Sequence, residues 1–177
     1  MNVWSQNNEK LIKTNKKTQY NINMDELMKS DEMKKVLENA LSNETNERIT
    51  QMSREKIDEY KNKLFDELNI SNEQKEELKN SLRLYRFVDD INDFKEGTFI
   101  RWINLNKIAD FSDLKLERGA HISEIKMMDD DVHIVCKSLW SKRGPRYIEL
   151  LGGNNLIFQK LTDQELIILS VIDYLNK

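Results

Sequence analysis

The chain has 177 residues, of which 38% are hydrophobic and 33% charged, so it is more polar than an average globular domain. Its net charge of −3 argues against a protein that coats nucleic acid by bulk electrostatics, since such proteins carry a large excess of Lys and Arg. Neither the first 25 residues nor any later segment has the apolar run of a signal peptide or a membrane helix. We therefore expect a cytoplasmic protein that is neither secreted by that route nor membrane-spanning. Cys136 is the only cysteine, which excludes an intrachain disulfide and a cysteine-based zinc site.

The N-terminal half is predicted to be a polar arm followed by helices. Residues 1–23 are rich in Asn and Lys without any period, which predicts a disordered arm. Residues 24–93 form the predicted helical region, where apolar residues recur every three to five positions. Its helices are expected over 25–42, over 46–69, and from Ser71 toward Ile91, the third opened by a capping box of Ser71 and Gln74. The narrow apolar stripes favour a helical hairpin packed on the rest of the chain, with a docking surface for another protein as the alternative.

Residues 94–177 form the predicted second domain. All five glycines and the only proline lie after residue 80, as do most aromatic residues, which is typical of short strands joined by tight turns. Strands are expected over 97–105, 120–128, 131–138, 145–151 and 155–161. Their number and turn spacing resemble the small barrels of the SH3-like, Sm-like and OB-like types. The predicted fold class is α+β: an N-terminal helical extension, then a small five-stranded antiparallel β-barrel-like domain with a C-terminal helix. A fragment of residues 82–177 is expected to fold alone.

The terminal helix begins at a second capping box, formed by Thr162 and Glu165. Its sequence, LIILSVIDYLNK from Leu166 onward, is apolar almost all the way round, so one contact face does not cover it. We expect the helix to pack between the β-domain and the helix that runs from Leu78 toward Ile91, with any exposed remainder acting as a dimer surface.

One stretch carries a family resemblance. The segment LYRFVDDINDFKEGTFIRWINLNK, residues 84–107, together with the strands that follow and the closing TDQELIILSVIDYLNK, resembles a group of uncharacterised proteins of giant nucleocytoplasmic DNA viruses. The resemblance covers about the last 95 residues. The excess of Lys, Asn and Ile fits the AT-rich genomes of several such viruses. The resemblance implies a viral protein in the host cytoplasm or the virion, and it implies no catalytic residue.

Signals for catalysis, cofactors and metals are lacking in the sequence. Gly152 and Gly153 are not followed by the Lys-Ser/Thr of a phosphate-binding loop. His121 and His133 have no histidine partner at metal-ligand spacing, and the acidic run at Asp131 lacks the alternating ligands of a calcium loop. We therefore expect no enzyme activity, no cofactor and no metal, and an active site that sequence motifs do not reveal is the alternative left open.

One group of residues suggests binding. Cations and aromatic rings gather around a Gly-Pro turn, and a sixth residue on the first predicted strand extends the group: Trp140, Lys142, Arg143, Arg146, Tyr147 and Arg101. Small β-domains bind single-stranded nucleic acid with this mixture, because rings stack on bases and cations follow phosphates. The alternative is a structural hairpin in which Trp140 and Tyr147 form a cross-strand pair.

The predicted function is that of a non-catalytic interaction protein, adaptor or structural. Its helices and small barrel would dock partner proteins or a second copy of the chain. The alternative is a single-stranded nucleic-acid-binding module that uses the hairpin of residues 140–147.

Overall fold

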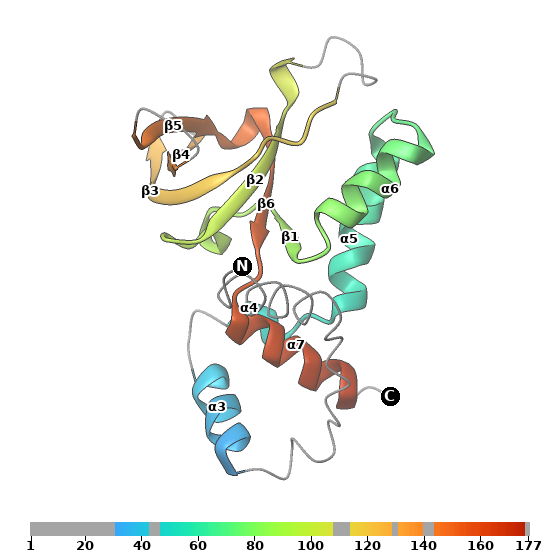
Figure 1. Ribbon diagram of the computed structural model, residues 1–177, viewed down its shortest axis with the longest axis vertical. Coiled ribbons are helices and arrows are strands. Elements are labelled where there is room, and N and C mark those ends of the chain that lie inside the picture. The colour runs from blue at the N-terminus through green and yellow to red at the C-terminus, as the bar shows by residue number, and fades with distance from the viewer. Residues whose placement is uncertain (1–30, 43–46, 108–113, 129–130, 140–143, 176–177) are drawn as a thin grey trace, which may run out of the picture. The chain divides into compact units, whose positions relative to one another are not determined.

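The computed structural model describes residues 31–42, 47–107, 114–128, 131–139 and 144–175. The chain divides into two compact units, residues 1–39 and 40–177. The first contains most of helix α3 (Asp31–Leu41), which lies within the predicted helix over 25–42. The predicted disordered arm, residues 1–23, lies outside the described residues. All other described elements belong to the second unit (Figure 1).

Three helices precede the sheet, and two of them replace the single helix predicted over 46–69. Helix α4 (Glu47–Thr50) ends before Ser53, whose extended backbone and hydroxyl start a new helix by accepting a hydrogen bond from Lys56 N. Helix α5 (Arg54–Glu67) follows, and then helix α6 (Asn72–Ser81). The predicted capping box at Ser71 and Gln74 is confirmed, because each side chain bonds the other residue's backbone N–H.

The third helix is shorter than predicted. It ends at Ser81, and the carbonyl oxygen of its C-cap residue Leu82 accepts a hydrogen bond of 3.0 Å from Lys61 Nζ on α5. The next residues form strand β1 (Tyr85–Val88), in which half-buried and buried side chains alternate with period two. The prediction of a helix continuing to Ile91 was therefore wrong. The spacing of the apolar residues Tyr85, Phe87 and Val88 is compatible with a helix and with a strand. The segment forms a strand because it pairs with β6.

The second unit contains a six-stranded antiparallel sheet, not a five-stranded barrel. The remaining elements, in chain order, are the 3-10 turn η2 (Ile91–Asp93), β2 (Phe99–Asn104), the turn η3 (Leu105–Lys107), β3 (Ala120–Met128), β4 (Asp131–Ser138), β5 (Arg146–Leu151), the turn η5 (Gly152–Asn154), β6 (Asn155–Lys160) and helix α7 (Asp163–Leu175). The strand order is β1-β6-β2-β3-β4-β5, in which β2 to β5 form the predicted meander.

The predicted barrel is wrong because the two end strands, β1 and β5, do not pair with each other. The sheet is nevertheless bent. Three strands lie between β5 and β6 in the order, yet only the three residues of η5 join them, and three residues span about 10 Å. The fifth predicted strand therefore turns back to pair with the first, and β1 adds a sixth strand beside it.

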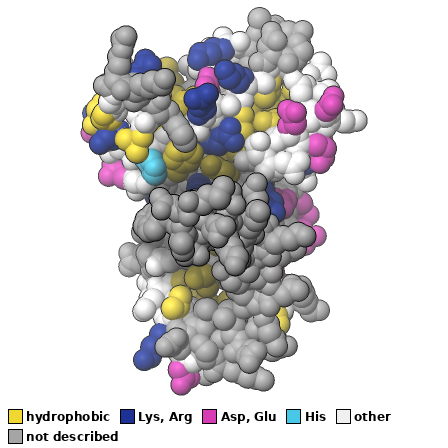
Figure 2. All heavy atoms as spheres, viewed as in Figure 1, with side chains coloured by type: hydrophobic (Ala, Val, Ile, Leu, Met, Phe, Trp, Pro, Cys, Tyr) yellow, Lys and Arg dark blue, Asp and Glu magenta, His cyan; other side chains and the backbone are white. Residues whose placement is uncertain are grey.

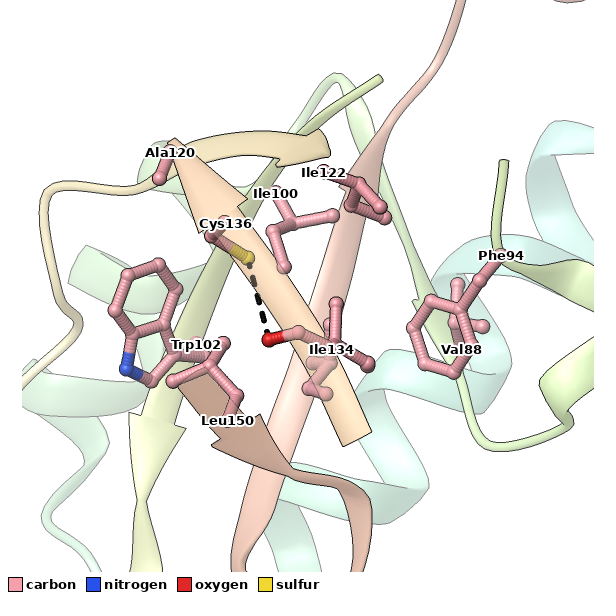
Figure 3. Close-up of a cluster of buried hydrophobic side chains, with 10 residues drawn as sticks. Val88, Phe94, Ile100, Trp102, Ala120, Ile122, Ile134, Cys136 and Leu150 are labelled. Carbon is pink, nitrogen blue, oxygen red and sulfur yellow. Dashed lines mark hydrogen bonds between the residues drawn. The ribbon is translucent and has the colours of Figure 1, made fainter. Parts of the chain in front are cut away.

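The inner face of the bent sheet holds an apolar core (Figure 3). Side chains from all six strands and from Phe94 meet there, and the fully buried members include Ile100, Ile134 and Cys136. Cys136 Sγ lies 3.9 Å from the Ile134 carbonyl oxygen within this cluster. The predicted core position of Cys136 is confirmed.

The opposite, outer face is covered by α5 and α6 over β1, β6 and the end of β2. Phe65 and Leu82 from the helices pack on Ile103 and Phe158 of the sheet, and all four side chains are fully buried. The rings of Phe65 and Phe158 are 6.0 Å apart at their centroids. Beyond these helices, the outer face of β3, β4 and β5 carries exposed and half-buried side chains.

Helix α7 begins at the predicted capping box. Thr162 N donates to Glu165 Oε2 at 2.8 Å, and Glu165 N donates to Thr162 Oγ1 at 3.2 Å. Its buried residues Ile168 and Leu169 pack with Ile49 of α4 and Ile57 of α5, not with α6 as predicted. The predicted partner helix does not exist beyond Ser81, so α4 and the first turn of α5 cover α7 instead.

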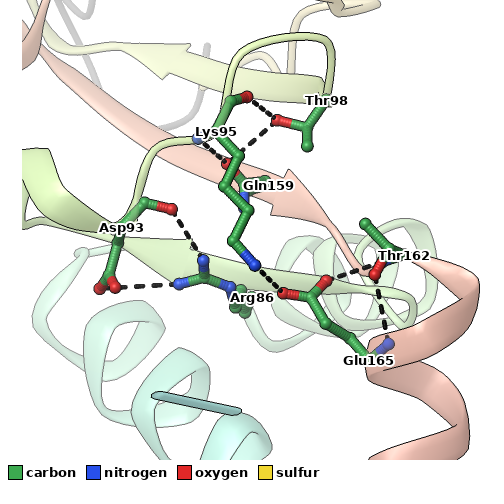
Figure 4. Close-up of polar contacts among 7 residues, drawn as sticks. All are labelled: Arg86, Asp93, Lys95, Thr98, Gln159, Thr162 and Glu165. Atoms are coloured by element: carbon green, nitrogen blue, oxygen red, sulfur yellow. Dashed lines mark hydrogen bonds and ion pairs between the residues drawn. The ribbon is translucent and has the colours of Figure 1, made fainter. Parts of the chain in front are cut away.

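Two groups of polar contacts lie beside the sheet, one at Arg86 of β1 and one between β6 and α7 (Figure 4). Arg86 NH2 donates to the Asp93 carbonyl oxygen at 2.9 Å, and Lys95 Nζ lies 3.1 Å from Glu165 Oε1. The Gln159 side-chain oxygen accepts hydrogen bonds from Lys95 N and from the Thr98 hydroxyl. Lys95 therefore links Gln159 of β6 to Glu165 of α7, whereas Arg86 Nε and Gln159 Nε2 have no hydrogen-bond partner among the described residues.

Candidate nucleic-acid interface

One row of side chains crosses the whole sheet. The strand register places Tyr85 opposite Lys160, Phe99 opposite His121, His121 opposite Lys137, and Lys137 opposite Tyr147. The pairing of β2 with β6 begins at Ile100 and Gln159, so Phe99 and Lys160 occupy the next pair of positions. We call these six residues the outer row: Tyr85, Lys160, Phe99, His121, Lys137 and Tyr147. Neighbouring strands are about 4.8 Å apart, so the row extends over about 24 Å.

The outer row faces away from the inner core. Its strand neighbours Ile100, Cys136 and Ile148 belong to the inner cluster, and adjacent side chains of a strand point to opposite faces. Tyr147 is 65% exposed, and His121 and Lys160 are also exposed. The other three members of the row are half-buried. An aromatic ring or imidazole thus alternates with a lysine along most of the row, and the row is open to solvent over β2 to β5.

Phe99 is held in place by His121 of β3 and by Gly119, the residue before β3. Its ring lies edge to face against His121, with centroids 5.1 Å apart and an interplanar angle of 73°. On the other side it lies against Gly119, whose φ of +96° favours glycine. A Cβ at Gly119 would sit 2.7 Å from Phe99 Cε1, so the missing side chain makes room for the ring. His121 Nδ1 lies 3.2 Å from the Gly97 carbonyl oxygen, which leaves its other ring nitrogen for a different partner.

Arg101 lies beside the row on the same face, because it is two residues from Phe99 on β2. Burial raises the pKa of Tyr85, and the positive charge of Arg101 opposes that rise. The Tyr85 hydroxyl is therefore protonated at neutral pH and available as a hydrogen-bond donor. Arg101 Nε donates to the Glu117 carbonyl oxygen at 3.0 Å, which anchors the guanidinium next to β2.

Further cations lie at this end of β2. The segment before β3 runs along β2, with a bridge between Ile103 and Leu116 and a hydrogen bond of 2.9 Å from Glu117 N to Trp102 O. It carries exposed Lys115 and Arg118, and exposed Lys107 lies in η3. Glu117 is the one acidic residue of the described segment 114–119, and its carboxylate lies 3.5 Å from Lys107 Nζ. One flank of the outer row is therefore basic.

The other flank of the row contains acidic residues that have cationic or imidazole partners. Glu124 and Glu149 both lie opposite Val135 in the register. Glu124 Oε2 lies 3.0 Å from Lys126 Nζ, and Glu149 Oε1 lies 2.8 Å from His133 Nδ1. A polyanion would therefore follow the basic flank, on the side of Arg101 and Arg118.

The surface view agrees with this distribution of charge. Where Figure 1 draws the sheet, Figure 2 shows Lys and Arg side chains gathered beside hydrophobic ones, and acidic side chains gathered toward α6. The chain as a whole carries 28 basic and 31 acidic residues, a net charge of −3. A local basic patch can attract a polyanion even when the net charge of the chain is negative.

Three of the six binding residues predicted from sequence, Trp140, Lys142 and Arg143, lie outside the described residues. Of the others, Tyr147 is a member of the outer row. Arg101 is on the same face two residues from Phe99, and its strand β2 is three strands away from the β5 strand of Tyr147. Arg146 is exposed, but it alternates with Tyr147 and belongs to the opposite face of β5. The predicted hairpin therefore shares one described residue with the row.

Five members of the row were not predicted as binding residues: Tyr85, Phe99, His121, Lys137 and Lys160. They are far apart in sequence and become neighbours only through strand register. The sequence predicts a helix at Tyr85, and it gives His121 no role beyond its place in the predicted strand 120–128. The signal that would have found the row is the alternation of each strand combined with the correct pairing order, which a single sequence does not provide.

Features that would indicate catalysis are weak in the described part of the chain. Burial raises the pKa of the Cys136 thiol to about 12, so this cysteine is not a nucleophile at neutral pH. His133 and Glu149 are hydrogen-bonded to each other. Their same-face neighbours in the register are Lys126, Val135 and Leu151, so no Ser, Thr or Cys nucleophile lies at these register positions beside the imidazole. Among the described residues no group of three His, Cys, Asp or Glu side chains is placed to hold a metal ion.

Comparisons with known proteins give no assignment: no protein-family model, no curated protein and no solved structure matches this chain. The resemblance to viral proteins therefore stays a prediction. Within the described ranges no helix has both the length and the apolar character needed to cross a membrane.

Proposed function

We propose that this protein is a non-catalytic binding protein whose ligand is single-stranded nucleic acid, bound across the outer row. The observation that carries the proposal is the row itself: aromatic rings, an imidazole and lysines in adjacent register positions over six strands. Bases of a single strand stack on aromatic side chains irrespective of sequence, and cations beside the rings contact the phosphates.

The asymmetry of the flanks supports the proposal further. Arg101, Lys107, Lys115 and Arg118 supply positive charge along one side of the row, where a phosphate backbone would run. Because these contacts are electrostatic, affinity falls as salt rises, with a slope of about −0.7 per phosphate contacted for a single strand.

The test is fluorescence anisotropy of labelled 12-nucleotide oligo(dT) and oligo(U) with the full chain between 50 and 200 mM salt. The variant Lys137→Ala/Lys160→Ala removes two cations from the row. Two lost phosphate contacts would lower the salt slope by about 1.4 and weaken binding of both oligonucleotides.

The matched control is Lys56→Ala/Lys63→Ala, which removes two exposed lysines from α5 and changes the net charge equally. We expect this control to keep most of the affinity. Equal losses in the two double variants would mean that net charge alone matters, and absence of binding by the unmodified chain at 50 mM salt would refute the proposal.

Docking of partner proteins, or of a second copy, remains a prediction from the helical stripes. Four of the apolar residues of α7 that motivated it pack in a cluster with Ile49, Ile57 and Leu161: Leu166, Ile168, Leu169 and Ile172. Large exposed apolar side chains such as Tyr60 and Leu175 occur singly along the described helices of the second unit, and single exposures are ordinary on protein surfaces.

A further inference from the structure

His121 occupies the position of the outer row between a ring and a cation. The strand register places it opposite Phe99 of β2 on one side and opposite Lys137 of β4 on the other. The His121 side chain is exposed. Imidazole is the side chain whose charge ordinarily changes between about pH 5 and 8. The charge at the centre of the row therefore depends on whether His121 holds one proton or two.

One hydrogen bond determines where the second proton of His121 binds. Nδ1 lies 3.2 Å from the Gly97 carbonyl oxygen, and a carbonyl oxygen can only accept, so Nδ1 carries the proton of the neutral ring. The acceptor is itself held in place, because Gly97 N donates to the Ile122 carbonyl oxygen at 2.8 Å. In the neutral ring Nε2 therefore has a free lone pair. A second proton binds at Nε2, where it turns an acceptor into a donor and makes the ring positive.

The elements around His121 supply several cations. Lys137 lies directly opposite on β4, and Arg101 lies on the same face of β2, two residues from Phe99. Arg118, in the segment before β3, is exposed. Lys95, in the segment before β2, is bonded to a carboxylate of α7. A phosphate attracted to Lys137 or Arg101 would therefore come close to the imidazole.

The carboxylates nearest to His121 in the chain do not lie opposite it in the sheet. Glu124 lies 3.0 Å from a lysine of its own strand, and Glu117 lies 3.5 Å from a lysine of η3. Glu96 adjoins Gly97 and is exposed. Neither of the two residues opposite His121 in the register is acidic. A phosphate of a bound strand would supply the negative charge that these positions lack.

We infer that His121 is a proton-linked phosphate contact: when a single strand binds along the outer row, Nε2 takes up a proton from solvent and donates it in a hydrogen bond to a phosphate oxygen. This role rests on the proposed function. The lone pair of a neutral Nε2 would repel a phosphate oxygen, so contact and protonation occur together. Strand binding and protonation then favour each other by the same factor. Affinity for the strand therefore rises as the pH falls from about 8 to about 5.5.

The test is fluorescence anisotropy of the full chain with labelled 12-nucleotide oligo(dT) at pH 8 and at pH 5.5, each between 50 and 200 mM salt. Oligo(dT) is suitable because thymine does not change its charge in this range. We expect binding at pH 5.5 to be about 1.5- to 5-fold tighter, the gain of one exposed ion pair. The salt slope should steepen by about 0.7, the value for one more phosphate contact. His121→Gln should remove both differences and keep the affinity of the unmodified chain at pH 8.

The matched control is His133→Gln, because His133 is the only other histidine of the chain and is bonded to Glu149 on the acidic flank. This variant should keep the pH dependence. The ¹⁵N resonances of the imidazole in the unmodified chain give a second readout that needs no variant. At pH 7, oligo(dT) should move the Nε2 resonance of His121 toward that of a protonated ring.

Three results would overturn the inference and leave the proposed function standing. They are an equal pH dependence in His121→Gln, an affinity that falls on acidification, as expected if Nε2 accepted a hydrogen bond from a base, and a neutral Nε2 resonance in the complex at pH 5.5. Absence of oligo(dT) binding at both pH values would instead remove the proposed function together with this role of His121.

Discussion

Phe99 and His121 lie edge to face, with ring centroids 5.1 Å apart, at the centre of a row of aromatic and basic side chains that crosses all six strands. The pair joins β2 to β3 at a point where only two residues of each strand are paired. The Phe99 ring is therefore both a sheet contact and the central aromatic surface of the proposed nucleic-acid interface.

Replacing Phe99 by Leu keeps an apolar contact with Gly119 but removes the ring. Stacking of a base on an aromatic side chain contributes about 1–3 kcal/mol, so we expect about 5- to 150-fold weaker binding of oligo(dT) by anisotropy at fixed salt. The salt slope should not change, because no charge is lost. Tyr60→Ala, at an exposed ring on α5, is the matched control. Unchanged affinity in Phe99→Leu would remove Phe99 from the interface.

Shortening a side chain of α7 to Ala should lower the free energy of unfolding strongly at Ile168 and only slightly at Ile172, one turn further on. Ile168 is 1% exposed and packs with Ile49 and Ile57, whereas Ile172 is half-buried. We expect Ile168→Ala to lower the free energy of unfolding by about 2–5 kcal/mol, and Ile172→Ala to lower it by less. Urea unfolding followed by circular dichroism measures both. Equal and small losses would mean that α7 is not part of the core in solution.

Cys136 should make the protein less stable at high pH. Burial raises the pKa of its thiol from the usual 9.0 to about 12 in the folded state. The folded state therefore holds its proton above pH 9 while the unfolded state loses it, so stability is complete below pH 9 and falls between pH 9 and 12. Cys136→Ala should flatten this part of the pH profile after correction for its own cavity cost. An identical fall in the variant would assign the effect to other groups.

A shortened chain tests how the helices and the sheet depend on each other. Composition favours a self-sufficient fragment of residues 82–177, but the packing favours the opposite outcome. Phe65 and Leu78 cover Ile103 and Phe158, which are fully buried in the intact chain. We expect residues 40–177 to unfold cooperatively and residues 82–177 to be less stable or to aggregate. Similar melting temperatures for the two fragments would show that α4 to α6 are accessory.

Much of the sheet was predictable because its strands alternate and its turns carry their own chemistry. The predicted strands over 120–128 and 131–138 coincide with β3 and β4, and the two capping boxes start α6 and α7 where expected. The break between α4 and α5 was not predicted. The chain breaks there because Ser53 has an extended backbone, and its hydroxyl caps the new helix α5 by accepting a hydrogen bond from Lys56 N.

The pairing of strands was less predictable than their positions. β1 carries only four residues, and its partner β6 is 70 positions further along the chain, so no local pattern identifies it. The same property hides the outer row, since Tyr85, Phe99 and Lys137 become neighbours only when the whole sheet has formed. The sequence therefore indicated a binding site made of aromatic rings and cations. In the fold, the rings and cations that lie side by side are mostly other residues than the predicted ones.

The most direct test of the central claim is a ¹⁵N–¹H NMR titration of the full chain with unlabelled 12-nucleotide oligo(dT) at 50 mM salt. We predict that the largest amide shifts follow the outer row from Lys160 through Phe99, His121 and Lys137 to Tyr147, and extend to Arg101 and Arg118 on its basic flank. Shifts confined to other surfaces, or no shifts at millimolar oligonucleotide, would contradict the proposal that this face binds single-stranded nucleic acid.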